Sequence, residues 1–237
     1  MRLSVPIYQL KRQAKRQARQ YNIPLNQALD QVAKVEGFSN WGVLADFHAR
    51  RKPTAKIFDA LQPGDLVLLG ARPGHGKTLM GLELIVEALK GDRHAAFYSL
   101  EYSERDVKDR FSDLGFKTIA KFDKLTVDTS DEICAAHIIE AQGQQPRGSV
   151  AVVDYMQLLD QDRSKPALEN QMSALKAFAE QTGNIMIMIS QIDRSYVPQV
   201  QSMPEIGDVR LPNAINLDVF TKTVFLQDGC VQLQKTA

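Results

Sequence analysis

The chain has 237 residues, 44% of them apolar, and its 29 Lys and Arg residues nearly balance its 28 Asp and Glu residues. This length allows one sizeable core with a small accessory domain. No apolar run approaches the roughly 20 residues needed to cross a bilayer, and the N-terminus lacks the apolar block of a signal peptide. The two cysteines, Cys134 and Cys230, are far apart in apolar contexts, which argues against a disulfide framework or a cysteine-based metal site. We therefore expect a cytoplasmic protein that does not associate with membranes.

The charge is distributed unevenly along the chain. Residues 1–56 hold 11 Lys and Arg residues and 3 Asp and Glu residues, a net charge of +8, whereas the remaining residues have a net charge of −7. A basic segment on an acidic body suggests an anionic partner, of which nucleic acid is the commonest. A solvated charged face that docks on the acidic body explains the same counts equally well.

The first 50 or so residues have the pattern of three helices. In the first, residues 7–21, apolar or small residues recur at spacings of three and four: Ile7, Leu10, Ala14, Ala18 and Tyr21. Five basic residues lie between them: Lys11, Arg12, Lys15, Arg16 and Arg19. Pro24 can open a second helix that stops at Gly37, and Ser39 or Asn40 can cap a third, followed by a linker at residues 50–54. The sequence therefore predicts a basic helical N-terminal module over residues 1–52 and a second domain over residues 53–237.

Beyond the linker, short apolar runs alternate with amphipathic segments. Strands are expected at residues 66–70, 95–99, 124–127, 150–154 and 185–190. Helices are expected at residues 77–89, after the capping box of Ser103 and Asp106, at residues 131–142, and at residues 167–182 before Gly183. Two further runs, 222–226 and 231–234, flank Asp228 and Gly229 and predict a terminal hairpin. This alternation is typical of an α/β fold with a mostly parallel central sheet flanked by helices.

A phosphate-binding loop follows the first expected strand. Residues 66–70 lead into Ala71, Arg72, Pro73, Gly74, His75, Gly76, Lys77, Thr78 and Leu79, and then into a helix with one apolar face. The glycines let backbone N–H groups approach phosphates, Lys77 adds a full charge, and the Thr78 hydroxyl can ligate magnesium. Ala71 departs from the general motif, which has glycine there. We therefore predict that this loop binds ATP together with Mg²⁺.

Three later strands deliver polar side chains to the edge of the sheet at which ligands sit in open α/β folds. Asp154 ends one strand and would hold magnesium, directly or through water, although buried strands often end in Asp as a turn starter. Glu101 lies just past another strand and can deprotonate the attacking water, but acidic residues are also favoured in the first turn of a helix. Gln191 follows Ser190 at the end of a third strand, where a neutral amide can sense the γ-phosphate.

Together these motifs resemble, in order and spacing, the motor domain of the DnaB-type replicative helicases. The resemblance is carried by residues 71–78, 99–101, 154–158, 190–194 and 208–210, and it covers about residues 60–235. That family characteristically has Ala-Arg-Pro before its Gly-Lys-Thr, so Ala71 fits. The resemblance implies a RecA-like P-loop NTPase, ATP hydrolysis with magnesium, and a ring of identical chains with each nucleotide between neighbours. It makes Glu101, Lys77 and Gln191 the expected catalytic residues, and Thr78 and Asp154 the expected magnesium ligands.

Two features of the family have weaker counterparts here. Its DNA-facing loops correspond to residues 161–165 and 194–199, which are modestly basic and fit either contact with single-stranded DNA or a plain surface. Its arginine finger lies in a late Lys-x-Arg, where this chain has Lys235 and Ala237. That difference predicts a slow ATPase, a ring completed by another arginine such as Arg210, or a protein that is not a processive motor.

The leading interpretation is an ATPase of the DnaB-helicase type that acts on DNA, or is recruited to it through the basic residues 11–19. The alternative is a RecA-like nucleotide-dependent regulatory or assembly ATPase without unwinding activity. A third reading, a P-loop kinase for a small substrate, is weaker because no arginine-rich lid segment follows the expected sheet.

Overall fold

The computed structural model describes residues 7–50, 53–115, 123–160, 165–198, 201–211, 213 and 215–235. The chain divides into two compact units, Met1–Pro53 and Thr54–Ala237. Each unit has its own hydrophobic core. Within the described ranges, no helix is both long enough and apolar enough to span a membrane.

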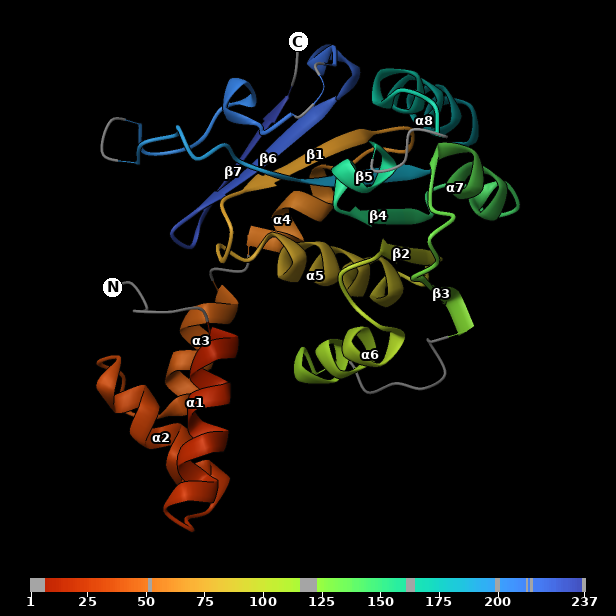
Figure 1. The fold of residues 1–237 in the computed structure, drawn as a ribbon. Helices are drawn as coiled ribbons and strands as arrows, with labels where there is room; N and C mark the ends of the chain where they lie inside the picture. Colours follow the sequence, from red (N-terminus) through yellow and green to blue (C-terminus); the bar gives the residue numbers. More distant parts are fainter. Residues whose placement is uncertain are drawn as a thin grey trace. The chain divides into compact units, whose positions relative to one another are not determined.

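The first unit is built of three helices, α1 (Ile7–Gln20), α2 (Leu25–Val35) and α3 (Trp41–Arg50) (Figure 1). Their shared core consists of Leu10, Ala14, Ala28, Val32, Ala33, Phe38 and Leu44. The expected cap at Asn40 is present, because its Oδ1 accepts a hydrogen bond from the Val43 N–H at 2.9 Å. Tyr21 was expected on the apolar face, and this was wrong: it lies just beyond α1 and is 62% exposed.

The second unit contains a seven-stranded sheet in the order β3-β2-β4-β5-β1-β6-β7. Six strands are parallel, and β7 pairs with β6 in the antiparallel direction. The strands are β1 (Leu66–Ala71), β2 (Ala95–Ser99), β3 (Leu125–Asp128), β4 (Val150–Asp154), β5 (Ile185–Gln191), β6 (Lys222–Gln227) and β7 (Cys230–Lys235). These bounds confirm the predicted strands and the predicted hairpin to within about one residue at each end.

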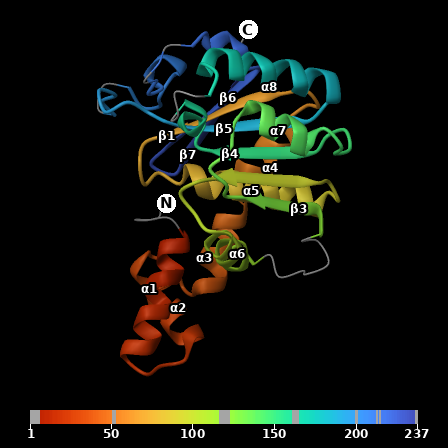
Figure 2. The same ribbon diagram turned by 45° about the vertical axis from the view of Figure 1, so that its right-hand side comes forward.

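Helices cover both faces of this sheet (Figures 1 and 2). The helices α4 (Pro53–Ala60), α5 (Lys77–Lys90) and α6 (Glu104–Asp113) pack on one face, against strand residues such as Val67, Leu69 and Val152. The helices α7 (Ala135–Gln142) and α8 (Leu168–Thr182) pack on the other, against strand residues such as Leu66, Leu68 and Val153. Burial on both faces explains why the strands are continuously apolar. The predicted α/β class is confirmed.

Three local expectations had different outcomes. The capping box at the start of α6 is confirmed: Ser103 Oγ accepts from the Asp106 N–H, and Asp106 Oδ2 accepts from the Ser103 N–H. The helix expected from residue 131 begins only at Ala135, because residues 131–134 form a turn before it. The expected linker was wrong at Pro53, which is the first residue of α4, a position where the ring of proline is tolerated.

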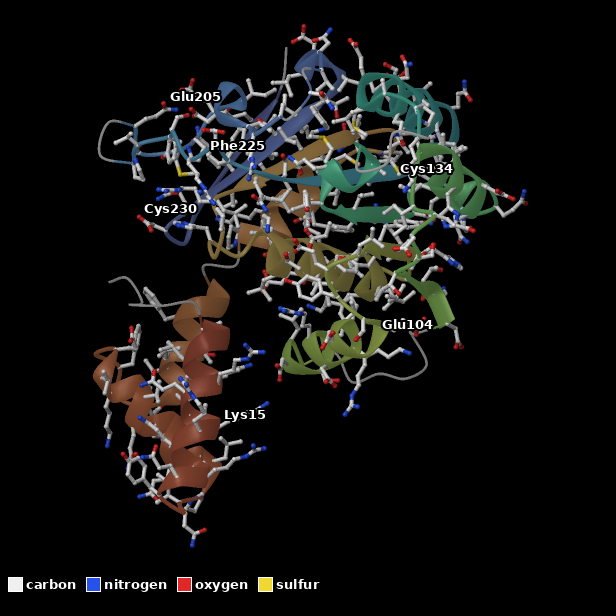
Figure 3. The ribbon with its side chains drawn as sticks, in the orientation of Figure 1. Lys15, Glu104, Cys134, Glu205, Phe225 and Cys230 are labelled. Atoms are coloured by element: carbon white, nitrogen blue, oxygen red, sulfur yellow. The ribbon has the colours of Figure 1, made fainter. Side chains whose placement is uncertain are left out.

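A buried ion pair lies at the edge of the sheet where β1 and β6 begin. The Lys222 ammonium donates to Asp65 Oδ2, and both residues are 6% exposed. The Thr221 hydroxyl donates to the other carboxylate oxygen of Asp65 at 2.8 Å. The two cysteines are free, Cys134 beside α7 and Cys230 at the start of β7, as the labels in Figure 3 show, so the expectation that they form no disulfide holds.

Candidate nucleotide-binding site

The parallel register brings the predicted site residues to one edge of the sheet. Ala71 of β1 is level with Gln191 of β5, and Asp154 of β4 is level with Ser99 of β2. Glu101 follows Ser99 by two residues, and its N–H donates to the Ser99 hydroxyl at 3.1 Å. The carboxyl ends of the adjacent strands β2, β4, β5 and β1 therefore carry all four elements that the sequence predicted for a nucleotide site.

The phosphate loop is shaped by two glycines with left-handed backbone angles. Gly74 has φ 81° and Gly76 has φ 90°, and an added Cβ would meet no atom within 4 Å at either position. The need for glycine there is therefore conformational, since a side chain would have room but would strain the backbone. Helix α5 begins immediately afterwards at Lys77, so its first N–H groups and its positive dipole end face this loop.

The carboxylate of Asp154 is the most unusual group at this edge. Asp154 is fully buried, and neither of its oxygens has a hydrogen-bond partner among the described residues. Burial raises the pKa of this carboxyl, because a charge is costly where water is excluded. The neighbouring Thr78 hydroxyl and Lys77 ammonium oppose that increase in the pKa, the hydroxyl without completing a hydrogen bond. A buried, unpaired carboxylate beside a buried hydroxyl has the oxygen ligands that a Mg²⁺ ion prefers.

Glu101 and one arginine also act on Asp154 through their charges. The Glu101 carboxylate raises the pKa of Asp154, and the Arg110 guanidinium lowers it. Arg110 belongs to α6, and its guanidinium carbon lies 4.3 Å from the centre of the Tyr102 ring. The stacked ring holds the arginine beside the segment that carries Glu101. Sequence reasoning missed Arg110, whose only signal was its place on the helix that follows the Ser-Leu-Glu motif.

Gln191 is joined to the phosphate loop through the backbone. The Ile192 N–H, one residue further on, donates to the Ala71 carbonyl at 3.1 Å. The Arg210 N–H donates to the Gln191 carbonyl at 2.8 Å. Backbone hydrogen bonds at Gln191 and the next residue therefore link the end of β5 to Ala71, at the start of the phosphate loop, and to Arg210.

The tip of the β6–β7 hairpin contacts the phosphate loop, which the sequence did not predict. The Asp228 N–H donates to His75 Nδ1 at 3.1 Å, and one Asp228 carboxylate oxygen lies 3.9 Å from the same nitrogen. Asp228 and Gly229 both have positive φ, as a tight two-residue turn requires. The tip of the hairpin is thus hydrogen-bonded to the middle of the phosphate loop.

In the segments expected to face DNA, Lys165 and Tyr196 are engaged with the protein itself, whereas Arg194 is exposed. Residues 161–164 and 199 lie outside the described ranges. The Lys165 ammonium donates to the backbone carbonyls of Asp131 and Ile133 at 2.9 and 3.0 Å. Tyr196 is 4% exposed, and its hydroxyl donates to the Gln201 carbonyl at 2.7 Å. Neither side chain is presented to a nucleic acid in this conformation.

The chain's last strand leads away from its own phosphate loop. Lys235 of β7 is level with Lys222, at the end of β6 opposite the hairpin tip. Ala237, which stands where the family has its arginine finger, lies outside the described residues. Arg210, which the sequence suggested as an alternative trans-acting arginine, is exposed.

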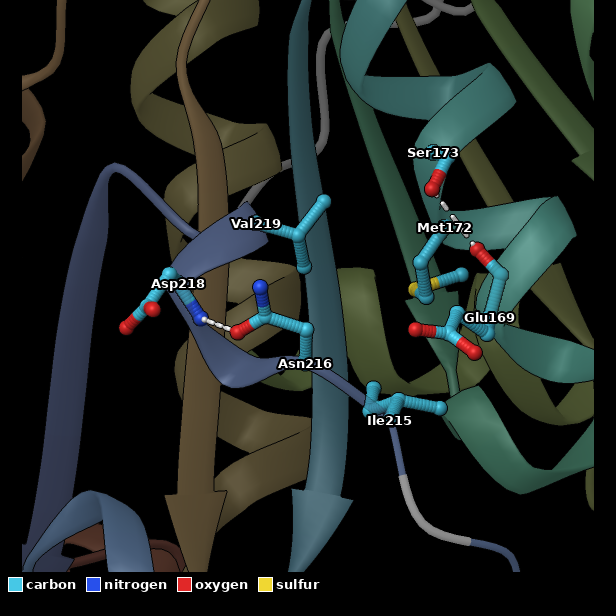
Figure 4. Close-up of a pocket in the computed structure, with 7 residues that line it drawn as sticks. All are labelled: Glu169, Met172, Ser173, Ile215, Asn216, Asp218 and Val219. Carbon is cyan, nitrogen blue, oxygen red and sulfur yellow. Dashed lines mark hydrogen bonds between the residues drawn. The ribbon is translucent and has the colours of Figure 1, made fainter.

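A cavity of about 270 Å³ lies elsewhere, between α8 and the short helix η4 (Leu217–Val219) (Figure 4). It is lined by Glu169, Met172, Ser173, Ile215, Asn216, Asp218 and Val219. None of these is a predicted site residue. Inside it, Asn216 Oδ1 accepts from the Asp218 N–H at 2.9 Å, so the amide serves to cap η4.

Comparisons with known proteins agree with the arrangement at the sheet edge. Residues 52–121, which include the phosphate loop and Glu101, match the family model of the DnaB-like helicase C terminal domain. The replicative DNA helicase DnaB of Helicobacter pylori strain J99 is 27% identical over 187 residues, 65% of this chain and 38% of that protein. The DnaB of Pasteurella multocida is 24% identical over 229 residues, 80% of this chain and 47% of that protein.

The fold has solved counterparts. A DnaB-like replicative helicase, described with its interactions with primase, superposes with a TM-score of 0.57 and 18% identity, covering 92% of this chain and 66% of that one. A separate ATPase domain superposes with a TM-score of 0.52 and 19% identity over 69% of each chain. The RecA-like fold is thereby confirmed.

The chain spans less than half the length of the curated relatives it matches. The family model nevertheless covers the part of the P-loop unit that carries the phosphate loop and the Ser-Leu-Glu motif. This P-loop unit is thus similar, in sequence and in fold, to the C-terminal ATPase domain of DnaB-like replicative helicases, as its motifs predict.

Proposed function

We propose that the P-loop unit binds ATP with Mg²⁺ and hydrolyses it, as an ATPase of the DnaB-helicase type. The observation that carries this proposal is the buried carboxylate of Asp154, which lacks a partner among the described residues. Leaving such a group unpaired costs folding free energy, so its retention is best explained by a ligand. Asp154 ends β4, which lies between β2, the strand before Glu101, and β5, which ends at Gln191.

The phosphate groups of ATP would be held by the loop and the start of α5. The open backbone around Gly74 and Gly76 leaves room for phosphate oxygens to approach N–H groups. Lys77, the first residue of the helix, would neutralise charge on the β- and γ-phosphates. Pro73 and Leu79 complete the loop without offering charge, and Arg72 adds a second cation at its entrance.

The residues present fit a magnesium ion. Thr78 Oγ1 and the Asp154 carboxylate would hold the ion, directly or through water, with phosphate oxygens filling other positions. A bound Mg²⁺ supplies charge neutralisation for the phosphate oxygens. The same charge would lower the pKa of Asp154 and stabilise its ionised form, which burial now disfavours.

Glu101 is the proposed general base. Its carboxylate lies on the exposed side of the edge and would accept a proton from the water that attacks the γ-phosphorus, while the bond to the leaving oxygen of ADP breaks. The positive charge of Arg110 acts on Asp154 and would also favour a phosphate bound there. Gln191 would detect the presence or loss of the γ-phosphate by hydrogen bonding.

Action on DNA is the second part of the proposal. On α1, Arg12, Lys15, Arg16 and Arg19 are exposed, and a row of such charges binds phosphate backbones with strong salt dependence. The resemblance further implies assembly of identical chains into a ring with nucleotide at each junction. Native mass measurement with and without an ATP analogue tests assembly, and a strict monomer in both states would remove the trans-acting part of the mechanism.

A regulatory ATPase that does not unwind DNA is the alternative, and one observation favours it. The Tyr196 ring, the only aromatic in the expected DNA-facing loops, is buried and its hydroxyl is already bonded. Stacking on bases, a main source of single-strand affinity, would require that loop to rearrange. Strand displacement on a forked duplex, with and without ATP, separates the two functions.

The test of hydrolysis itself compares wild type with Lys77→Ala. We expect the variant to lose at least about 100-fold in ATP turnover, because a preorganised charge at the transferred phosphate is removed. Lys90→Ala, at the other end of the same helix, is the matched control and should keep the wild-type rate. Turnover that survives Lys77→Ala unchanged would exclude this site.

A further inference from the structure

The side chain of Gln157 connects two segments that leave the candidate site. Gln157 lies in the short helix η2 (Met156–Asp160), which begins two residues after Asp154. Its Nε2 donates to the Ser190 hydroxyl at 2.9 Å and to the Arg210 carbonyl at 2.7 Å. A carbonyl can only accept, so the contact with Arg210 fixes which end of the amide is the nitrogen.

The segment that Gln157 holds is the folded loop of residues 192–211. Its two ends form a short antiparallel pair beyond β5, with a bridge between Ile192 and Val209. The Asp193 N–H donates to the Asp208 carbonyl at 2.7 Å within this pair. The interior of the loop contains Tyr196. The described residues of this loop, 192–198 and 201–211, are thus joined to the sheet at both ends, and Ile192, Tyr196 and Val209 pack into the core on one face of the sheet.

Arg210 is the point of attachment on the return side of the loop. Its N–H donates to the Gln191 carbonyl at 2.8 Å, and its carbonyl accepts from Gln157. The N–H and the carbonyl of Arg210 are thus both hydrogen-bonded to segments that adjoin candidate site residues. One segment follows Asp154 in the chain, and the other contains Gln191.

We propose that Gln157 is a positioning residue that transmits the state of the nucleotide site to the loop of residues 192–211, an inference that rests on the proposed function. A ligand at Asp154 shifts the segment that begins there, and Gln157 passes this shift to Arg210. The buried Oε1 of Gln157 has no hydrogen-bond partner among the described residues, so the amide can take a new donor when the site is loaded. The device couples ATP to the loop that the family resemblance places toward DNA.

The experiment follows trypsin cleavage of the full chain after Arg194 and Arg210, which are both exposed on this loop. The wild type, Gln157→Leu and the control Gln181→Leu, an exposed glutamine on α8, are each digested with and without Mg²⁺ and a non-hydrolysable ATP analogue. We expect the analogue to change cleavage at these arginines by at least about fivefold in the wild type and the control, and not in Gln157→Leu. A fluorescent ATP analogue should bind all three proteins alike.

Two further variants separate amide donation from packing. Gln157→Glu keeps the size of the side chain but cannot donate to the Arg210 carbonyl at neutral pH, so it should behave like Gln157→Leu. Ser190→Ala removes only the second acceptor and should keep a reduced response. Persistence of the full response in Gln157→Leu or Gln157→Glu, or a wild type that binds the analogue without any change in cleavage, would overturn the role of Gln157 alone. A wild type that neither binds nor hydrolyses ATP would overturn the proposed function and this inference together.

Discussion

Asp228, at the tip of the last hairpin, donates its backbone N–H to Nδ1 of His75 in the middle of the phosphate loop, across 3.1 Å. The two residues are 153 positions apart in the chain, so the hairpin and the loop meet only in the folded protein. The contact requires His75 Nδ1 to be an acceptor. It supports the loop at a position between its two glycines.

Replacing His75 with alanine should therefore weaken ATP binding. One such hydrogen bond contributes about 1 kcal/mol, so we expect the KM for ATP to rise about fivefold with a smaller effect on kcat. Steady-state ATP turnover measures both parameters. Asp228→Asn keeps the N–H and tolerates a positive φ, so it should leave KM unchanged. A loss in Asp228→Asn equal to that in His75→Ala would assign the effect to the carboxylate instead.

Asp154→Asn should stabilise the nucleotide-free protein while abolishing hydrolysis. The substitution removes a buried charge that lacks a partner, and we expect the free energy of unfolding to rise by about 1–3 kcal/mol. Thermal unfolding without nucleotide measures this gain. A lower Tm in the variant would mean that the carboxylate is paired in solution.

The Asp154 carboxyl should also make the free energy of unfolding of the apo protein depend on pH. Burial raises the folded-state pKa of Asp154 above its value in the unfolded chain, so the native state binds the proton more tightly. Stability from this group therefore increases as pH falls through the folded pKa, until the unfolded chain also takes up the proton. Unfolding curves across this range should show that the stability of the wild type increases relative to that of Asp154→Asn as pH falls. Saturating Mg²⁺ and an ATP analogue should remove it.

Arg110 is expected to contribute to turnover more than to folding. Arg110→Ala should lower kcat by at least about tenfold, since a positive charge near the transferred phosphate is lost. Arg105→Ala, an exposed arginine on the same helix, is the matched control. Equal rates in the two variants would show that Arg110 only packs against Tyr102.

The exposed arginines of α1 should determine the salt dependence of DNA binding. Each phosphate contact contributes about 0.7 to the slope of log affinity against log salt for single strands. Replacing Arg12, Arg16 and Arg19 with glutamine should lower that slope by up to about 2 and weaken binding for all sequences alike. Lys34→Gln on α2 is the control. An unchanged slope would exclude this helix as the nucleic-acid contact.

Lys222→Met should destabilise the P-loop unit strongly. It leaves the Asp65 carboxylate buried without its cation, a loss of about 3 kcal/mol. Denaturant unfolding measures the change. The double variant with Asp65→Asn should recover much of the stability, and a double variant as unstable as the single one would show that packing of the lysine stem dominates.

Much of the fold was predictable because local patterns and the tertiary environment agree. Strands such as β4 and β5 are buried on both faces, so they read as unbroken apolar runs with clear ends. Helix α4 was missed because its first residues continue a basic, proline-containing segment that has the composition of a linker. The start of α7 was placed too early because Asp131 and Glu132 are acidic, which suits a first helical turn and a turn before a helix equally well.

The phosphate loop was recognised from sequence alone because its requirements are local: two positive-φ glycines, a lysine and a hydroxyl where a strand passes into a helix. Glu101, Asp154 and Gln191 could be predicted to lie together because residues at the ends of parallel strands share one edge, whatever the strand order. The packing of the tertiary structure alone determined that Asp154 is buried without a partner among the described residues, that Arg110 stacks on Tyr102, and that His75 and Gln157 contact Asp228 and Arg210. Those relationships join residues far apart in the chain, so they depend on which strands become neighbours and on how closely the intervening segments pack.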